Sequence, residues 1–104
     1  MKITLSPTRR DQRLTLERQG DQLIVNGEVF DFGQLAEGAT LPARAIKSPW
    51  FANGTVIART NGDLALTIVL PHGEKAPQAT LFPDPITVTK NGPIDLPAYS
   101  MEEN

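Results

Sequence analysis

The sequence predicts a mainly β fold, a small antiparallel β-sandwich or barrel-like domain built from hairpins, with at most one short helix. Asn-Gly pairs recur along the 104 residues, and both members of such a pair tolerate the positive φ that a type I′ hairpin turn requires. Between them, short stretches alternate apolar and polar residues with the period of a strand. Almost all of the nine prolines lie outside these stretches. The pairs are Asn26-Gly27, Asn53-Gly54, Asn61-Gly62 and Asn91-Gly92.

The first block, residues 3–32, contains two or three expected strands. Leu14 and Leu16 alternate with polar residues before a break at Gly20. A two-residue turn at Asn26-Gly27 then predicts a hairpin that pairs Val25 with Glu28, Ile24 with Val29 and Leu23 with Phe30. Since side chains alternate, one face carries both phenylalanines and is the expected core face. That face comprises Leu23, Val25, Phe30 and Phe32.

A second hairpin is expected over residues 55–70, around Asn61-Gly62. The turn predicts the pairs Thr60 with Asp63, Arg59 with Leu64, Ala58 with Ala65 and Ile57 with Leu66. A register slip by one residue would expose the apolar stripe of the second strand, so turn and pattern support each other. The stripe comprises Leu64, Leu66, Ile68 and Leu70.

A third hairpin is expected over residues 86–96. A three-residue turn that includes Pro93 sets Val88 against Leu96, which matches two apolar residues. Because proline cannot donate a ladder hydrogen bond, this hairpin is expected at the edge or end of a sheet.

Two long connections separate the three blocks. In the first, residues 33–53, Pro42 is expected to open one short helical turn that Pro49 ends. The second, residues 71–85, holds four prolines and the single histidine, without periodicity. Residues 1–97 are thus expected to form one β domain, and residues 98–104 a flexible tail.

Composition excludes several classes of function. The net charge of −2 does not provide the basic field that nucleic-acid binding needs, so no nucleic-acid partner is expected. The chain has no cysteine, which excludes disulfides and thiolate metal sites. We expect no membrane association, because no apolar stretch approaches spanning length and the first residues lack a secretory signal. The cytoplasm is the expected location.

No residue pattern predicts catalysis. His72 is the one histidine, and the spacing of Glu74, Ser48 or Ser100 around it demands no catalytic arrangement. We therefore expect His72 to cap or pack a turn. The carboxylates match no Ca²⁺ loop, and the glycines belong to turns, so neither a metal nor a cofactor is expected.

Arginines concentrate near the start of the chain, at positions 9, 10, 13 and 18. Asp11 and Glu17 dilute this charge, and no aromatic residue is interleaved to stack on bases. The pattern favours a solvated surface or one whose arginines are paired within the molecule.

Two apolar segments have two interpretations each. Trp50 and Phe51 lie between Pro49 and the next turn; they either cover an open end of the core or form an exposed docking site. The segment 76–86 is either an extended strap with Leu81 and Phe82 as its anchors or a segment presented to a partner. Covering and strap are the favoured interpretations. Trp50, Phe51, His72, Leu81 and Phe82 are the candidate partner-contact residues.

Several runs of this sequence resemble a family of small phage and prophage proteins from the tail-gene region. The resemblance extends over nearly the whole chain, with its pieces in the family's order. The runs are Met1 to Pro7 with Arg9-Arg10-Asp11, Pro49-Trp50, Gly54 to Arg59, Gly62 to Gly73, Ala76-Pro77, Phe82-Pro83, Pro85 to Val88 and Asn91-Gly92-Pro93.

The resemblance implies a non-enzymatic structural or assembly protein of the phage tail that acts through protein–protein contacts. Its partners would be other tail proteins or further copies of itself, and its oligomeric state is left open. It would be located in the cytoplasm of the bacterial host, free or incorporated into the phage particle. The alternative is a small β module that binds a glycan or a peptide between its two long loops.

Overall fold

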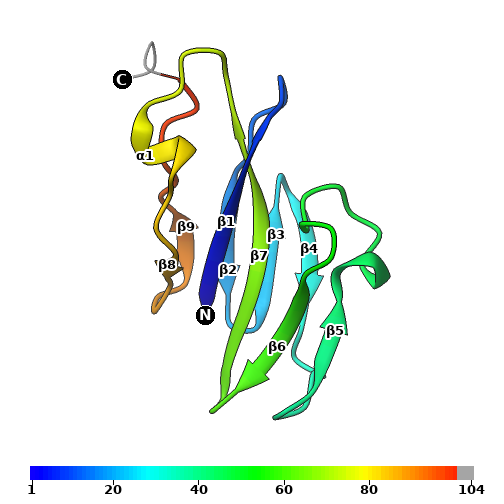
Figure 1. Ribbon diagram of the computed structural model, residues 1–104. Helices are drawn as coiled ribbons and strands as arrows, with labels where there is room; N and C mark the ends of the chain where they lie inside the picture. The colour runs from blue at the N-terminus through cyan, green and yellow to red at the C-terminus, as the bar shows by residue number, and fades with distance from the viewer. Residues whose placement is uncertain (101–104) are drawn as a thin grey trace.

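The computed structural model describes residues 1–100, and these residues form two β-sheets that stack face to face (Figure 1). The five-stranded sheet has the order β5 (Thr40–Pro42), β6 (Val56–Thr60), β7 (Asp63–His72), β1 (Lys2–Arg9) and β8 (Ile86–Thr87). The four-stranded sheet has the order β4 (Glu28–Asp31), β3 (Gln22–Val25), β2 (Leu16–Gln19) and β9 (Gly92–Ile94). The mainly β prediction is confirmed, and the two sheets form a sandwich rather than a closed barrel.

The hairpin at Asn26-Gly27 is confirmed in its register. Both residues have positive φ, 49° and 84°, as a type I′ turn requires. The three predicted pairs join β3 and β4, and Phe32 bonds across the ladder to the carbonyl of Asp21. On the predicted core face, Leu23, Val25 and Phe32 are buried and Phe30 is half-buried, whereas Val29 on the opposite face is 53% exposed.

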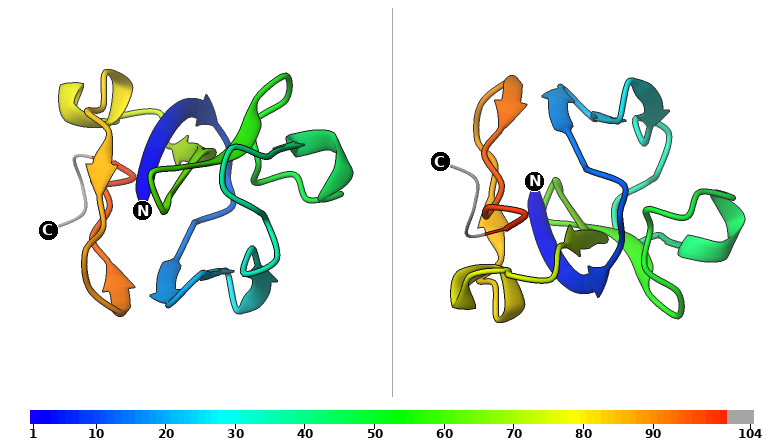
Figure 2. Two further views of the ribbon diagram at one scale, coloured as in Figure 1. Left: turned by 90° about the horizontal axis from the view of Figure 1, so that it is seen from below. Right: turned by 90° about the horizontal axis from the view of Figure 1, so that it is seen from above.

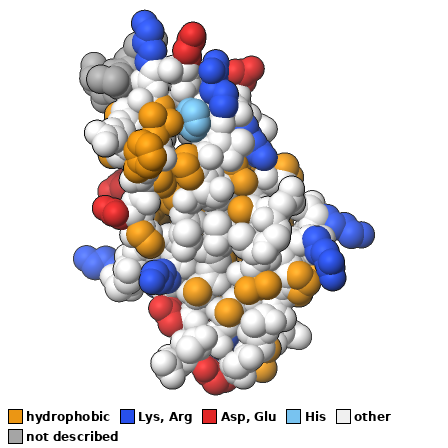
Figure 3. Space-filling model, viewed as in Figure 1, with side chains coloured by type: hydrophobic (Ala, Val, Ile, Leu, Met, Phe, Trp, Pro, Cys, Tyr) orange, Lys and Arg blue, Asp and Glu red, His pale blue; other side chains and the backbone are white. Residues whose placement is uncertain are grey.

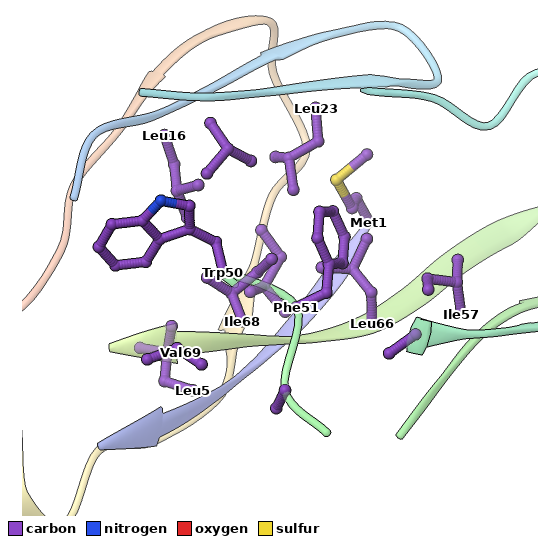
Figure 4. Packing of buried hydrophobic residues seen from close by; sticks show 14 of the residues in the cluster. Met1, Leu5, Leu16, Leu23, Trp50, Phe51, Ile57, Leu66, Ile68 and Val69 are labelled. Atoms are coloured by element: carbon purple, nitrogen blue, oxygen red, sulfur yellow. The ribbon is translucent and has the colours of Figure 1, made fainter. Parts of the chain in front are cut away.

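The hairpin at Asn61-Gly62 is confirmed for three of its four predicted pairs, from Thr60 and Asp63 to Ala58 and Ala65. Beyond Ala58 the strands separate, so the predicted pairing of Ile57 with Leu66 does not occur. Residues 50–52 take the place of β6 there. Ala52 donates to the carbonyl of Thr67, and Val69 donates to that of Trp50. The apolar stripe of β7 is nevertheless buried along its length, and Figure 4 shows two of its members, Leu66 and Ile68, in the core.

One strand pair departs from the antiparallel pattern. β1 runs parallel to β7 over eight residue pairs, from Lys2 beside Ala65 to Arg9 beside His72. Ile3 and Leu5 of β1 thereby lie on the same inner face as Leu66 and Ile68. The two strands are far apart in sequence, so no turn signal reports their pairing.

The predicted third hairpin is wrong. β8 pairs with β1 in one sheet, whereas β9 pairs with β2 in the other. The segment between them crosses from sheet to sheet along one side of the sandwich, as Figure 2 shows. Val88 is buried there and donates to the carbonyl of Met1 instead of facing Leu96. Pro93 does lie in an edge strand, as expected.

Two short helical turns interrupt the connections. A 3-10 turn, η1 (Ala43–Ala45), follows Pro42 as predicted, but it ends before Lys47, whose φ is positive, and not at Pro49. The α-helix α1 (Gln78–Leu81) follows Pro77 in the connection where an extended strap was expected. Ala98 and Tyr99 hydrogen-bond to the domain, so the start of the expected tail is held in place. The remaining tail residues, 101–104, lie outside the described residues.

Candidate functional site

Trp50 and Phe51 belong to the core. Trp50 is 6% exposed and Phe51 3%, and the Phe51 ring packs edge-on against the rings of Phe30 and Phe32. Figure 4 shows both side chains between the two sheets. Arg10 lies over the Trp50 ring, with its guanidinium carbon 5.1 Å from the ring centroid. Both residues are therefore buried, and neither is an exposed partner contact in this structure.

Leu81 and Phe82 are exposed, whereas they were expected to anchor a strap against the domain. They do not anchor a strap, because Phe82 is 75% exposed and Leu81 is exposed as well. The residue that enters the interior is Thr80, which is fully buried and donates its hydroxyl hydrogen to the carbonyl of Ala98. We call Leu81 and Phe82 the α1 patch.

His72 ends β7, and its side chain is half-exposed. Its Nδ1 lies 3.0 Å from the carbonyl oxygen of the adjacent Gly73, so the ring packs against its own turn as expected. Figure 3 shows apolar side chains gathered beside this histidine, in the region that α1 occupies in Figure 1. His72, Leu81 and Phe82 are thus the predicted contact residues that the structure leaves accessible.

The arginines near the start of the chain largely interact within the molecule, as expected. Arg18 donates to the carbonyls of Gly20 and Val88. Arg13 lies over the ring of Tyr99, with 4.4 Å between its guanidinium carbon and the ring centroid.

A groove opens beside this Arg13–Tyr99 pair. Its volume is about 310 Å³, and its walls come from the segment before β2, the end of β7 and the segment after β9. Most of the lining is apolar. The lining residues are Arg13, Leu14, Thr15, Leu70, Pro71, Leu96, Pro97, Ala98 and Tyr99. Of the two long connections, only Pro71 contributes to the lining of this groove.

A smaller cavity of about 220 Å³ shares Arg13 and Tyr99 with the groove. Its other lining residues, among those that the structure describes, are Arg9, Gly73, Glu74, Lys75 and Ser100, so most of its charged side chains are basic. We call the two spaces the apolar groove and the basic cavity.

Tyr99 lies between the two spaces and lines both of them. Its hydroxyl group donates to the carbonyl of Arg10, and its own carbonyl accepts from the amide of Gly73. A Cβ at Gly73 would lie 2.8 Å from the Tyr99 ring, so this position accommodates only glycine without a shift. Tyr99 lies in the expected tail and Leu14 and Leu96 in expected strands, so no local pattern in the sequence marks these three residues as parts of a site.

In the described part of the chain, acidic residues and His72 form no group that could hold a metal ion. None of the helices within residues 1–100 is both long and apolar enough to span a membrane. Comparisons with protein-family models, with curated proteins and with solved structures found no match.

Proposed function

We propose that this protein is a non-enzymatic structural or assembly protein of a phage or prophage tail, and that it acts through protein–protein contacts made by the α1 patch. The exposure of Phe82 carries this proposal. A large aromatic side chain that is 75% exposed loses the free energy of burial unless a partner covers it. Aromatic residues are also enriched among the side chains that dominate binding energy at interfaces.

The patch is held in a defined position, which supports a docking role over a loose loop. Thr80 is fully buried beneath it and tied to Ala98, and the amide of Phe82 bonds to the carbonyl of Gln78. A presented side chain on an ordered turn loses little conformational entropy when a partner binds. The resemblance to tail-region proteins suggests which partners to test first.

The test is co-purification of tail proteins with the wild type and with Phe82→Ser in cells that carry the phage. We expect the wild type to retain a tail protein or a second copy of itself, and Phe82→Ser to weaken this at least tenfold, since a central aromatic anchor contributes about 2 kcal/mol or more. Val29→Ser is the matched control, because Val29 is also exposed and apolar but lies on the four-stranded sheet.

Two results would contradict the proposal. One is a monomer that retains no tail protein, together with normal particles after deletion of the gene. The other is equal retention by the wild type and by Phe82→Ser. Far-UV circular dichroism of each variant separates lost binding from lost folding.

The apolar groove favours a second candidate function, ligand binding. It is concave, mainly apolar, and lies within the size range of small-ligand sites. This candidate differs from the first in the residues that it needs, since Leu81 and Phe82 do not line the groove.

A further inference from the structure

We infer that Asn53 is a site of spontaneous covalent modification, because it is the member of the four Asn-Gly pairs that the fold leaves free to deamidate. In deamidation, the amide nitrogen of the following glycine attacks the side-chain carbonyl carbon of the asparagine. The site includes neither residue of the α1 patch, and the inference does not depend on a role in phage tails.

The reaction needs only the chain and water. Hydroxide removes the proton of the Gly54 amide, and the nitrogen forms a bond to Cγ of Asn53 while the bond from Cγ to Nδ2 breaks. Nδ2 takes a proton from water, which restores the hydroxide, and leaves as ammonia. A five-membered succinimide ring remains, and water opens it at either carbonyl group to give aspartate or isoaspartate. Glycine favours the attack because it has no side chain to crowd its nitrogen.

Exposure to solvent does not distinguish the four asparagines, since all of them are exposed. They differ in the hydrogen bonds that must break before the glycine nitrogen can lose its proton and reach Cγ. A bond to the side-chain amide holds Cγ in place, and a bond from the glycine N–H to an anion makes its proton harder to remove. Either kind of bond therefore slows the reaction.

At Asn61 the reacting nitrogen is engaged. The amide of Gly62 donates to Oε1 of Glu37, and the amide of Asn61 donates to Oε2, each at 2.6 Å. The carboxylate also opposes the negative charge that the Gly62 nitrogen must take on. This pair is therefore expected to react slowly.

At Asn26 and Asn91 the side-chain amide is held instead. Oδ1 of Asn26 accepts from the Thr15 amide at 2.7 Å, and its Nδ2 donates to the Arg13 carbonyl at 3.1 Å. Oδ1 of Asn91 accepts from the Gly20 amide at 2.8 Å. Asn26 is thus fixed at both ends of its amide and Asn91 at one, so Asn91 should react faster than Asn26.

Asn53 has none of these restraints. Within residues 1–100, neither its side chain nor the amide of Gly54 takes part in a hydrogen bond. The turn is closed by Thr55, whose amide and hydroxyl group both donate to the carbonyl of Ala52. Gly54 has a φ of 78° at the third position, as in a type II turn. It is exposed and lines a hollow of about 290 Å³, which gives hydroxide access to the turn.

The modification would change a link within the five-stranded sheet. The turn joins residues 50–52, which hydrogen-bond to β7, to the start of β6. Isoaspartate inserts one extra carbon atom into the main chain there and adds a carboxylate. We expect the isoaspartyl form, separated by ion exchange, to unfold at a lower urea concentration than the unmodified protein, as measured by Trp50 fluorescence. An unchanged midpoint would contradict this consequence.

The experiment follows all four sites in one sample. The full chain is incubated in mildly alkaline buffer, and peptide mapping by mass spectrometry measures the deamidated fraction at each asparagine over time. We expect Asn53 to convert at least about tenfold faster than Asn61 and Asn26, since one hydrogen bond that must break corresponds to about this factor in rate. In urea the four rates should become similar, because the fold no longer distinguishes the pairs.

Glu37→Ala is the decisive variant, since Glu37 is exposed and its loss leaves the core intact. It should accelerate conversion of Asn61 about tenfold and leave the rate at Asn53 unchanged. Asn53→Gln is the matched control: the longer side chain does not form the five-membered ring readily, so the acidic species that appears first in the wild type should be lost. Far-UV circular dichroism checks that both variants fold.

Three outcomes would overturn the inference. They are conversion of another Asn-Gly pair at least as fast as that of Asn53 in the folded protein, slowing of Asn53 by folding as strongly as of Asn61, and an unchanged rate at Asn61 in folded Glu37→Ala. Phe82→Ser should deamidate as the wild type does. A failure of this site is therefore distinguishable from a failure of the α1 patch.

Discussion

The hairpin around Asn61-Gly62 and the segment around Asn91-Gly92 begin from the same dipeptide and end in different structures. At Asn61 both residues adopt positive φ, 54° and 79°, and the flanking strands pair directly. At Asn91 only the glycine does so, with φ of 112°, and the flanking strands enter different sheets. The first turn closes a ladder, whereas the second sits in a crossing between the two layers.

The difference lies in what the flanking residues bury. The strand after Asn61 has four inward aliphatic residues at alternating positions, so the register that the turn favours also places them in the core. Around Asn91 the strands are short. Val88 is buried at the side of the sandwich, where its amide donates to the carbonyl of Met1, and it does not pair across a hairpin. A turn dipeptide determines strand pairing only where the register that it favours also buries the apolar side chains of both strands.

The largest effect is expected from removing part of the aliphatic stripe. Ile68→Ala should lower the free energy of unfolding by about 2–5 kcal/mol, because Ile68 is fully buried between the sheets and the change leaves a cavity. Urea denaturation followed by tryptophan fluorescence measures it. Val29→Ala should cost less than about 0.5 kcal/mol. Similar losses for both would mean that the stripe is not the core.

A smaller loss of unfolding free energy is expected from substituting Thr80, the buried residue of α1. Thr80→Val keeps the shape of the side chain but removes the hydrogen bond to Ala98, and it should cost about 1–3 kcal/mol because the carbonyl of Ala98 loses its protein partner. Thr80→Ser retains the hydroxyl group and should recover most of this loss. Hydrogen exchange at residues 96–100 should accelerate in the valine variant alone; unchanged exchange there would argue against Thr80 as the anchor.

The two Asn-Gly sites should respond differently to alanine. Asn61→Ala places a residue with a Cβ but no local side-chain hydrogen bond at φ 54°, at a cost of about 1–2 kcal/mol. Asn91→Ala loses only the hydrogen bond from the Gly20 amide to its side chain, about 0.5 kcal/mol at an exposed position. Thermal denaturation of both variants compares them directly. Equal losses would show that the two turns have the same role after all.

The smallest effect is expected at Asp63, next to the first turn. The hydrogen bond and charge of the Met1 ammonium group hold the pKa of this carboxyl below its ordinary value of 3.8. A lowered pKa in the folded state adds stability above the unfolded value, and this is lost as the pH falls through the folded value. Asp63 is 58% exposed, so solvent screens the pair.

Asp63→Asn should therefore be slightly less stable than the wild type at pH 7. The difference should shrink as the pH falls from about 5 toward 3. Urea denaturation at a series of pH values measures it, and a difference that grows on acidification would reverse the sign of the argument.

The candidate site shows where prediction from the sequence stopped. The sequence predicts His72, Leu81 and Phe82 as contact residues because they lie in a segment without periodicity, and the structure leaves them accessible. It predicts Trp50 and Phe51 because the single tryptophan adjoins a phenylalanine after Pro49, but both are buried because residues 50–52 pair with β7. No local pattern distinguishes the two cases. Whether an aromatic residue is covered depends on segments distant in the chain.

The sequence by itself determined the β class, the register of two hairpins and the inner stripe of β7. Those features follow from φ preferences and from side-chain alternation, which act over a few neighbouring residues. Only the tertiary structure decided the parallel pairing of β1 with β7, the crossing between β8 and β9, and the groove beside Tyr99. Each brings together segments that are distant in sequence, and which segments meet depends on the burial that the whole chain achieves.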